Sequence, residues 1–437
     1  MSHPVLNSPP ENNQRGDSPS EFSQNPTPTT ITMGIDWADQ EHQFAATLPD
    51  GTLETGSFQQ KPQAIKQWLD GFQSRFPNSQ LEIAIETSRG ALINALLECG
   101  GVSIFPINPH AMACYRKAFA HGGGKSDPVD ARLIMQFLVN NRSQLRALQL
   151  NQPLTRELAD LAQHRRALVE QRVALANRLK DLLKAYFPAV LELAPAKPYA
   201  HFIIALLLHY PTLEAVQLAG KNRIRKLFFG MGTKDKIEQR LQTLMEAQPI
   251  TTDPALLRTH ARYAQALAQQ IKMLNQSIKQ YDREIKRLLP THPDYRLFES
   301  LPGASDKTHA RLIAALGDDR NRFDSADALQ CAAGIAPLTE QSGKSRHVRR
   351  RWAATTFMMQ TFFEYAGLSI KGCAWAKAFY QSQLAKGKSS SMAKRSLAFK
   401  WIRIIYHCWK TSTPYDEATH LNRLTQQGSP LVHKLTA

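Results

Sequence analysis

The 437-residue chain is long enough for two or three domains, and its 43% hydrophobic and 21% charged residues suit a soluble globular protein. It has no run of about 18 apolar residues and no signal peptide, which argues against a membrane or secreted protein and predicts a cytoplasmic, nucleoid-associated one. Its five cysteines contain no CxxC pair, which predicts neither a zinc site nor disulfides. The net charge of +17 is uneven, with 14 Asp/Glu against 9 Lys/Arg in residues 1–132 and 16 Lys/Arg against 3 Asp/Glu in residues 341–437, which favours nucleic acid over a membrane surface as the partner.

The N-terminal third has the pattern of a mixed α/β domain. Residues 1–30 are rich in Pro, Ser, Asn and Thr and are predicted to form a disordered tail. After the tail, the alternation of apolar residues predicts strands at 30–37, 42–48, 52–58, 81–85 and 102–107, and helices at 63–76 and about 90–99. A further helix follows, and the order β-β-β-α-β-α-β-α is that of the RNase H fold.

Four carboxylates stand near the ends of these elements. Asp36 ends the first strand, Glu86 follows the fourth, and Asp127 and Asp130 open the helix after three glycines. An RNase H fold would gather all four, and such a cluster is unfavourable without cations because like charges raise each other's pKa. Two Mg²⁺ ions would fit it, one activating the attacking oxygen and one stabilising the leaving oxygen.

Each carboxylate also has an ordinary structural interpretation. Asp127 before Pro128 is a good helix N-cap, and Asp130 three residues later completes a start that resembles a capping box. Glu86 would cap the next helix, and Asp36 would lie in a turn. The conjunction of the four positions favours metal binding, although the cap is the better interpretation of the Asp127–Asp130 pair taken alone.

The middle of the chain predicts two long helices. A leucine recurs every seven residues from 154 to 182, with Arg165 and Arg172 interrupting the intervening seam. A second apolar seam at 3/4 spacing runs through residues 254–289. The sequence leaves open an antiparallel pair within the chain or a coiled coil between chains, and it does not assign the mostly helical insert at about 189–250.

The C-terminal region contains a possible DNA-backbone element and a serine in a cationic segment. LPGASDKTHARLIAALGD resembles a helix-hairpin-helix, although an ordinary helix pair with a Gly turn is about as good an interpretation. Ser342 lies between a glutamine and a glycine, where it would attack a phosphodiester or belong to a flexible phosphate-contact loop. From these residues alone the loop is the better interpretation, because no His base stands at a fixed spacing. Ser345 would serve as well, and His347 is interpreted as a surface residue. The cations expected to bind nucleic acid are Lys344, Arg346, Arg349, Arg350 and Arg351.

Several segments, in this order, resemble a known family. GIDWADQEH, IAIETSRG, VSIFPINP and GKSDPVDARLIMQFL are similar to the RuvC-like domain of the DEDD insertion-sequence transposases, the IS110 family, which includes the related Piv-type DNA invertases. LPGASDKTHARLIAALGD, FDSADALQCAAGIAPLTEQSGKSRHV and the helix at 387–409 resemble the C-terminal transposase domain of that family.

The resemblance implies roles for particular residues. It implies that Asp36, Glu86, Asp127 and Asp130 are the metal-binding DEDD set, and that Ser342 is a nucleophile that becomes covalently linked to DNA. It also implies recombination by a homo-oligomer, a dimer or tetramer, and for the transposase branch a noncoding bridge RNA that selects donor and target.

The expected architecture has three parts. We expect an α/β RNase H-like (RuvC-like) domain at about 31–148, a helical coiled-coil region at about 150–290, a small mostly α-helical C-terminal domain at about 300–412, and a tail at 413–437. The expected function is cleavage and rejoining of mobile-element DNA with Mg²⁺ and Ser342. The alternatives are a site-specific DNA invertase without a guide RNA, a non-catalytic nucleic-acid-binding protein, and a junction-resolving nuclease, which would not need the C-terminal domain.

Overall fold

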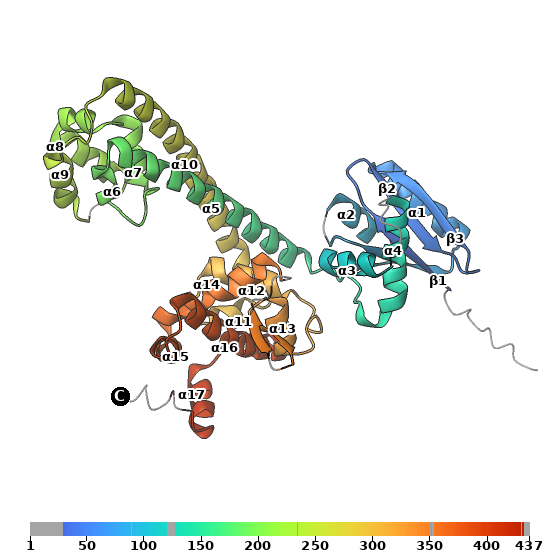
Figure 1. Ribbon diagram of the computed structural model, residues 1–437. Helices are drawn as coiled ribbons and strands as arrows, with labels where there is room; N and C mark the ends of the chain where they lie inside the picture. Colours follow the sequence, from blue (N-terminus) through green and yellow to red (C-terminus); the bar gives the residue numbers. More distant parts are fainter. Residues whose placement is uncertain are drawn as a thin grey trace, which may run out of the picture. The chain divides into compact units, whose positions relative to one another are not determined.

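The computed structural model describes residues 29–88, 90–119, 127–233, 235–343, 345–349, 351, 354–429 and 431. The chain divides into two compact units, residues 1–150 and 151–437 (Figure 1). The first unit ends close to the predicted boundary at 148, whereas the predicted middle and C-terminal regions belong to one unit. The predicted tail lies outside the described residues, apart from residues 29 and 30, which begin the first strand.

The first unit is a mixed α/β domain with five strands. Its elements are β1 (Thr29–Asp36), β2 (Glu41–Thr47), β3 (Leu53–Gln59), α1 (Pro62–Arg75), β4 (Ser79–Ile85), α2 (Ala91–Leu97), β5 (Val102–Pro106), α3 (Pro109–Phe119) and α4 (Asp127–Asn141), followed by a short 3-10 turn η1 (Arg142–Gln144). Each predicted strand and helix is present with ends shifted by one or two residues. Two helices, α3 and α4, follow β5, whereas the sequence predicted only the one that begins at Asp127.

The strands lie in the order β3-β2-β1-β4-β5. β1 pairs antiparallel with β2 and parallel with β4, while β5 continues the parallel half beside β4. The β2–β3 hairpin turns at Gly51, whose φ of 83° favours glycine, and the Asp50 carboxylate accepts hydrogen bonds from the Thr52 N–H (2.9 Å) and hydroxyl (2.7 Å). The sheet therefore has an antiparallel half, β3-β2-β1, and a parallel half, β1-β4-β5, with β1 and β4 adjacent near its middle.

Helices cover both faces of this sheet. On one face Ile31, Met33 and Ile35 of β1 share a buried core with the apolar sides of α1 and α2. On the other face α4 packs so closely on β1 that a Cβ at Gly34 would lie 2.3 Å from both the Ala131 carbonyl oxygen and the Met135 nitrogen. Only glycine permits this approach, so Gly34 sets the distance between α4 and the sheet.

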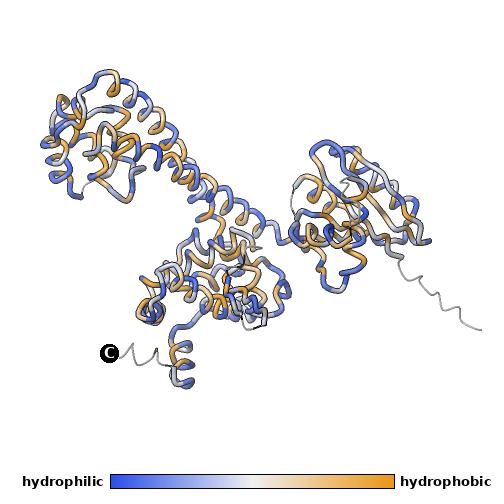
Figure 2. The backbone as a smooth tube through the Cα atoms, viewed as in Figure 1, coloured by the Kyte–Doolittle hydropathy of each residue, from blue (hydrophilic) through white to orange (hydrophobic). Residues whose placement is uncertain are grey.

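The second unit begins with two long helices, α5 (Pro153–Tyr186) and α10 (Pro254–Leu288). Arg165 Nε donates to Asp282 (2.5 Å) and Arg172 Nη1 to Asn275 (3.2 Å), so residue numbers rise on one helix as they fall on the other. The helices are therefore an antiparallel pair within one chain, which decides between the two predicted arrangements. Both show the alternating hydropathy of amphipathic helices in Figure 2.

The cross-helix bonds explain why arginines interrupt the predicted leucine seam. Leu158 and Leu179 are fully buried at the seam positions on either side of Arg165 and Arg172. Each of the two arginines meets a polar partner on α10, so the polar positions fix the register of the pair. The heptad leucines at 154, 161, 168, 175 and 182 are only partly buried.

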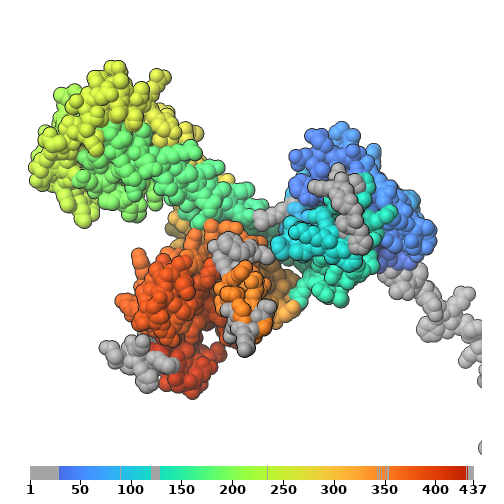
Figure 3. All heavy atoms as spheres, viewed as in Figure 1, coloured from blue at the N-terminus to red at the C-terminus, as the bar shows by residue number. Residues whose placement is uncertain are grey.

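The insert at 189–250 forms a small helical body at the far end of this pair. Its helices are α6 (Ala189–Glu192), α7 (His201–His209), α8 (Leu213–Gly230), which bends at Gly220, and α9 (Ile237–Glu246). They share one core with the adjoining ends of α5 and α10, and Figure 3 shows this part as a rounded body of green and yellow spheres. No single described helix is long and apolar enough to cross a membrane, and the bent pair α7–α8 qualifies only when both are combined.

The C-terminal part packs around the other end of the pair. It contains a 3-10 turn η2 (Leu289–Thr291), α11 (Tyr295–Glu299), α12 (Asp306–Leu316), α13 (Ala326–Ala332), β6 (Leu338–Ser342), β7 (Ser345–Arg349), α14 (Thr356–Gly372), α15 (Ala374–Ala385), α16 (Ser390–Thr411) and α17 (Glu417–Gln426). Trp375, Trp401 and Trp409 are fully buried in its core.

Two segments differ from the expectation. The Ser342 segment, expected as a loop in a mostly α-helical domain, forms the β6–β7 hairpin, in which Ser342 pairs with Ser345 across a tight turn. The expected tail at 413–437 contains α17, which begins with a side-chain cap from Asp416 and brings His420 within 4.7 Å of the Trp375 ring. The LPG segment forms a helix-turn-helix, with Gly303 at φ 74° packed against the α14 backbone.

Candidate active site

The first two predicted carboxylates lie side by side at one edge of the sheet. β1 and β4 are parallel with Ile35 opposite Ile85, so Asp36 and Glu86 each follow the last paired residue of adjacent strands. Side chains alternate along a strand, and Asp36 has the parity of Gly34, which faces α4. Glu86 likewise has the parity of Ala84, which packs in the core against α4. Both carboxylates therefore belong to the face that α4 covers.

Helix α4 brings the third carboxylate to the same place. Asp130 precedes Ala131, whose carbonyl is one of the two backbone groups in close contact with Gly34. Because Gly34 lies two residues before Asp36, this contact anchors the first turn of α4 beside the end of β1. Asp130 is 5% exposed, whereas Asp36 and Glu86 are half-buried.

A cation that the sequence did not indicate joins two of these carboxylates. Arg116, on α3, donates from Nε to Asp130 Oδ1 (2.9 Å) and from Nη2 to Glu86 Oε1. Burial opposes charge on the guanidinium, but the attraction of Glu86 and then of Asp130 outweighs it, so the pKa of Arg116 is raised. The only signal in the sequence was the acidic excess of residues 1–132, which calls for a counter-cation without naming one.

The kind of donor in this cluster fits Mg²⁺. Asp36, Glu86 and Asp130 offer carboxylate oxygens, the hard ligands that Mg²⁺ prefers. Within the described ranges, no group of three or more His, Cys, Asp or Glu side chains could hold a metal ion as they stand. The Asp127 backbone begins α4, as predicted, but its side chain lies outside the described residues. The number of ligands therefore depends on Asp127 and on where Arg116 lies.

The predicted nucleophile lies in the β6–β7 hairpin of the other unit. Ser342 is opposite Ser345 in register, and Gly343 between them has a φ of 57° that favours glycine. The Ser342 side chain lies outside the described residues. Ser345 Oγ lies 2.9 Å from His347 Nε2, and both residues are exposed. His347 was interpreted as an isolated surface residue, whereas the structure gives it a serine partner, because residues two apart share a face of a strand.

The predicted nucleic-acid-binding cations are only partly described. Arg349, at the end of β7, is exposed and pairs with Glu340 across the hairpin at 3.3 Å. Arg351 is half-buried, with a buried Nε that has no described hydrogen-bond partner. The side chains of the remaining three lie outside the described residues: Lys344, Arg346 and Arg350.

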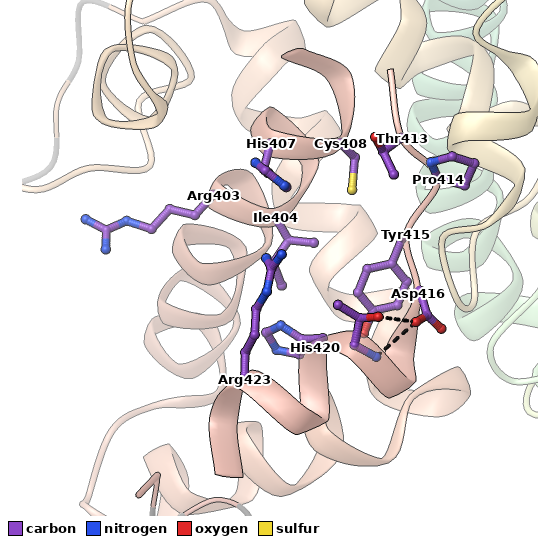
Figure 4. Close-up of a pocket in the computed structure, with 11 residues that line it drawn as sticks. Arg403, Ile404, His407, Cys408, Thr413, Pro414, Tyr415, Asp416, His420 and Arg423 are labelled. Carbon is purple, nitrogen blue, oxygen red and sulfur yellow. Dashed lines mark hydrogen bonds between the residues drawn. The ribbon is translucent and has the colours of Figure 1, made fainter. Parts of the chain in front are cut away.

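A pocket of about 260 Å³ lies between α16 and α17, away from the hairpin in sequence. Figure 4 shows Arg403, His407 and Arg423 around it, with the Asp416 carboxylate bonded to Thr419 at the start of α17. Asp416 acts there as a helix cap, and Arg403 pairs with Asp327. None of the predicted site residues lines this pocket. The pocket is formed where α17 packs beside α16.

Two family models match separate parts of the chain. A model described as a transposase matches residues 33–188, which include the four predicted acids. A model described as the IS116/IS110/IS902 family of transposases matches residues 295–381, which include Ser342.

Individual relatives extend over most of the chain. The mini-circle transposase candidate for IS117 of Streptomyces coelicolor is 28% identical over 89% of this chain and 96% of its own length. The 43.6 kDa protein of insertion element IS110, from the same organism, is 25% identical over 88% and 95%. A pilin gene-inverting protein of Moraxella bovis is 28% identical over 34% of this chain and 48% of its own length. With both family models and these relatives in agreement, the chain belongs to the IS110 family of transposases.

Proposed function

We propose that this chain cleaves and rejoins mobile-element DNA, with Asp36, Glu86, Asp127 and Asp130 holding Mg²⁺, two ions in all, and with Ser342 as the nucleophile. The observation that carries the proposal is the convergence of Asp36, Glu86 and Asp130 on one face at the ends of β1, β4 and the start of α4. The three acids come from three elements on the face that α4 covers, and Arg116 joins Glu86 to Asp130, which metal binding accounts for better than helix capping does.

The fold supports the same proposal. The chain order of the first unit and its sheet order β3-β2-β1-β4-β5, with β1 and β4 parallel, support an RNase H-like (RuvC-like) domain. Divalent cations, when bound, would neutralise a phosphodiester and favour ionisation of the attacking hydroxyl. The protein's own role in this step is to hold the carboxylates in place. The close contact of Gly34 with α4 and the parallel pairing of β1 with β4 serve this role.

The serine step conserves the energy of the DNA backbone. Ser342 Oγ attacks phosphorus, an Oγ–P bond forms and the P–O bond to the leaving nucleotide breaks. The serine proton passes to a base, and the leaving oxygen takes up a proton. Because one phosphodiester replaces another, attack by the hydroxyl of a second DNA end rejoins the strands and restores the serine without an external energy source.

The hairpin offers a base for this step and also a rival nucleophile. His347 lies within hydrogen-bond distance of Ser345 Oγ, and Ser345 lies opposite Ser342. A serine hydrogen-bonded to an imidazole is the arrangement that activates a hydroxyl for attack. The resemblance to the family favours Ser342, whereas the described contact favours Ser345, and the two serines must be tested separately.

Nucleic acid is the proposed partner of the basic C-terminal segment. The excess of 16 Lys/Arg over 3 Asp/Glu in residues 341–437 supports binding of DNA, and of a noncoding guide RNA that selects the sites. We also propose that the active form is a homo-oligomer, in which one chain can supply the acids and another the serine.

A second function has a specific observation in its favour. The similarity to a pilin gene-inverting protein covers about a third of this chain, and it supports a site-specific invertase that uses fixed sites and no guide RNA. An invertase inverts the segment between two sites in one DNA molecule, whereas a transposase moves the element to a new target site. The products therefore separate the two functions.

The test is a recombination assay in cells that carry the flanking element DNA and a target. Asp36→Asn and Ser342→Ala should each reduce joined products by about 100-fold or more, with Ser345→Ala as the matched control that retains them. A covalent protein–DNA adduct on a denaturing gel should disappear in Ser342→Ala. RNA that copurifies with the wild type is sequenced, and junction sequences identify transposition or inversion.

Each outcome assigns a different function. Loss with Ser345→Ala in place of Ser342→Ala makes Ser345 the nucleophile. Activity in both serine variants with loss in Asp36→Asn makes the protein a metal-only strand transferase. Full activity in all variants leaves a non-catalytic DNA-binding protein. Co-expression of Asp36→Asn with Ser342→Ala restores products only if separate chains contribute the acid and the serine.

A further inference from the structure

Arg116 occupies the centre of the acidic cluster from a helix that carries none of the acids. Its guanidinium contacts Asp130 from α4 and Glu86 from the end of β4, through Nε and Nη2. The side chains of Arg116, Glu86 and Asp130 are 28%, 16% and 7% exposed. Water therefore screens these ion pairs less than surface pairs, and they hold the two carboxylates together.

The position of Arg116 follows from the packing of α3 on α4. Met112 of α3 is fully buried, and the Tyr115 ring packs edge-on against Phe137 of α4 at 5.0 Å. Asn140, also on α4, donates to the Tyr115 hydroxyl at 2.8 Å. Because Arg116 follows Tyr115 directly, these contacts position its guanidinium beside Glu86 and Asp130.

The charges leave the cluster negative even with Arg116 present. Glu86 and Asp130 provide two carboxylates against the one guanidinium of Arg116, and the described side chains in this arrangement do not form a three-ligand metal group. We propose that Arg116 is an internal counter-cation that holds Glu86 and Asp130 together in the metal-free protein and releases at least one of them when a divalent cation binds. The inference rests on the proposed function, since it concerns the same acidic site.

Competition between the guanidinium and the metal has a measurable consequence. A metal ion held by the carboxylate oxygens that Arg116 contacts would displace at least one of its charge-assisted hydrogen bonds. Removing the guanidinium should therefore tighten metal binding, while the metal-free protein loses stability because two poorly solvated carboxylates lose their partner. A merely structural arginine would lower stability and also weaken metal binding, because the carboxylates would lose their alignment.

The experiment measures Mn²⁺ binding to the full chain by isothermal titration calorimetry at pH 7.5, without DNA. Arg116→Gln should bind Mn²⁺ about tenfold more tightly than the wild type. Its melting temperature should be lower without metal and should rise more on addition of Mn²⁺. Arg116→Lys keeps a charge but cannot bridge both carboxylates, so its affinity should lie between the two, and it serves if Arg116→Gln does not fold.

The matched control is Arg142→Gln. Arg142 makes a similar ion pair with Glu82 (2.7 Å) in the same unit, away from Asp36 and Asp130 in the sheet, so its loss should leave the Mn²⁺ affinity unchanged. Equal or weaker binding by Arg116→Gln, with the wild type binding Mn²⁺, overturns the inference alone. If neither the wild type nor Arg116→Gln binds Mn²⁺, and Asp130→Asn gives the same calorimetric trace as the wild type, the proposed metal site fails as well. Binding by Arg116→Gln with none by the wild type supports the inference in its strongest form.

Discussion

The two units each contain a cluster of three charges, and the clusters have opposite composition. In the first unit one arginine, Arg116, lies between two carboxylates, Glu86 and Asp130. In the second unit one carboxylate, Glu364 on α14, lies between Arg166 on α5 at 2.6 Å and Arg311 on α12. Both clusters join separate elements of the fold. The first has two carboxylates for one guanidinium, whereas in the second Glu170 also pairs with Arg166 at 2.7 Å and balances the second guanidinium.

The difference separates a site from a structural junction. Arg311 is 9% exposed, burial lowers its pKa despite the opposing effect of Glu364, and its guanidinium also lies 5.7 Å from the Phe357 ring. The second cluster is thus packed within the protein, and its ion pairs connect α5, α12 and α14. The first cluster lies at the edge of a sheet, next to the strand that ends at Asp36, and Arg116 balances only one of the two carboxylates that it contacts. Three substitutions break one side of this comparison at a time.

The largest effect is expected from Gly34→Ala in the first unit. The new Cβ would lie 2.3 Å from two backbone atoms of α4, which cannot move without displacing the helix that carries Asp130. We expect a loss of at least about 3 kcal/mol of unfolding free energy for this unit, measured by calorimetry of the full chain, and loss of recombination.

Gly71→Ala is the matched control for Gly34→Ala. Gly71 lies within α1, and a Cβ there would meet no atom within 4 Å. Alanine is the better helix former, so this variant should gain about 0.5–1 kcal/mol. A Gly34→Ala protein that melts like the wild type and retains recombination would show that close packing of α4 does not position the acids.

An intermediate effect is expected from Glu364→Gln in the second unit. The amide keeps the shape but leaves the buried Arg311 without a counter-charge and Arg166 with Glu170 alone, which should cost about 2 kcal/mol given that Glu364 is itself partly exposed. Urea unfolding measures the change. The control Glu170→Gln removes only an exposed i,i+4 partner of Arg166 and should cost less than about 0.5 kcal/mol. Equal losses in the two variants would contradict a structural role for the Glu364 cluster.

The sequence predicted the first unit better than the second. Strand alternation and turn residues are local signals, so the five strands and the positions of Asp36 and Glu86 at strand ends could be derived. The α3 helix was missed because Pro109–Phe119 has one fully buried residue, Met112, and so a weak apolar periodicity. Arg116 was missed with it, since no local pattern links an arginine to carboxylates 30 residues before and 14 residues after it.

In the second unit the helices were predictable and their partners were not. The seams of α5 and α10 predicted two long helices, but only the contacts of Arg165 with Asp282 and of Arg172 with Asn275 show that they pair within one chain. The β6–β7 hairpin was missed because strands of five residues rich in Ser, Arg and Gln have low β-propensity. The pairing of Ser345 with His347 depends on that hairpin and was missed for the same reason.

The smallest effect concerns pH and again separates the units. Burial lowers the pKa of His309, and both of its ring nitrogens are buried without a described hydrogen-bond partner. Burial also lowers the pKa of His201, His292 and His420, so all four shifts lie in the second unit. His292 is held neutral in part because its Nδ1 accepts the Asp294 N–H at 3.1 Å, which leaves Nε2–H to donate to Thr155.

The sign of the pH dependence follows from the lowered pKa values. Between the folded-state pKa of such a histidine and its ordinary value of 6.5, the unfolded chain binds a proton that the folded chain does not. The unfolding free energy of the second unit should therefore fall as the pH drops below 6.5, measured by urea unfolding between pH 7.5 and 5.5. His309→Leu should reduce this loss, whereas Tyr295→Phe, which changes the ring beside the imidazole and keeps the imidazole itself, should not. A pH slope in His309→Leu as steep as in the wild type would mean that His309 is already protonated, or solvated, in the folded unit.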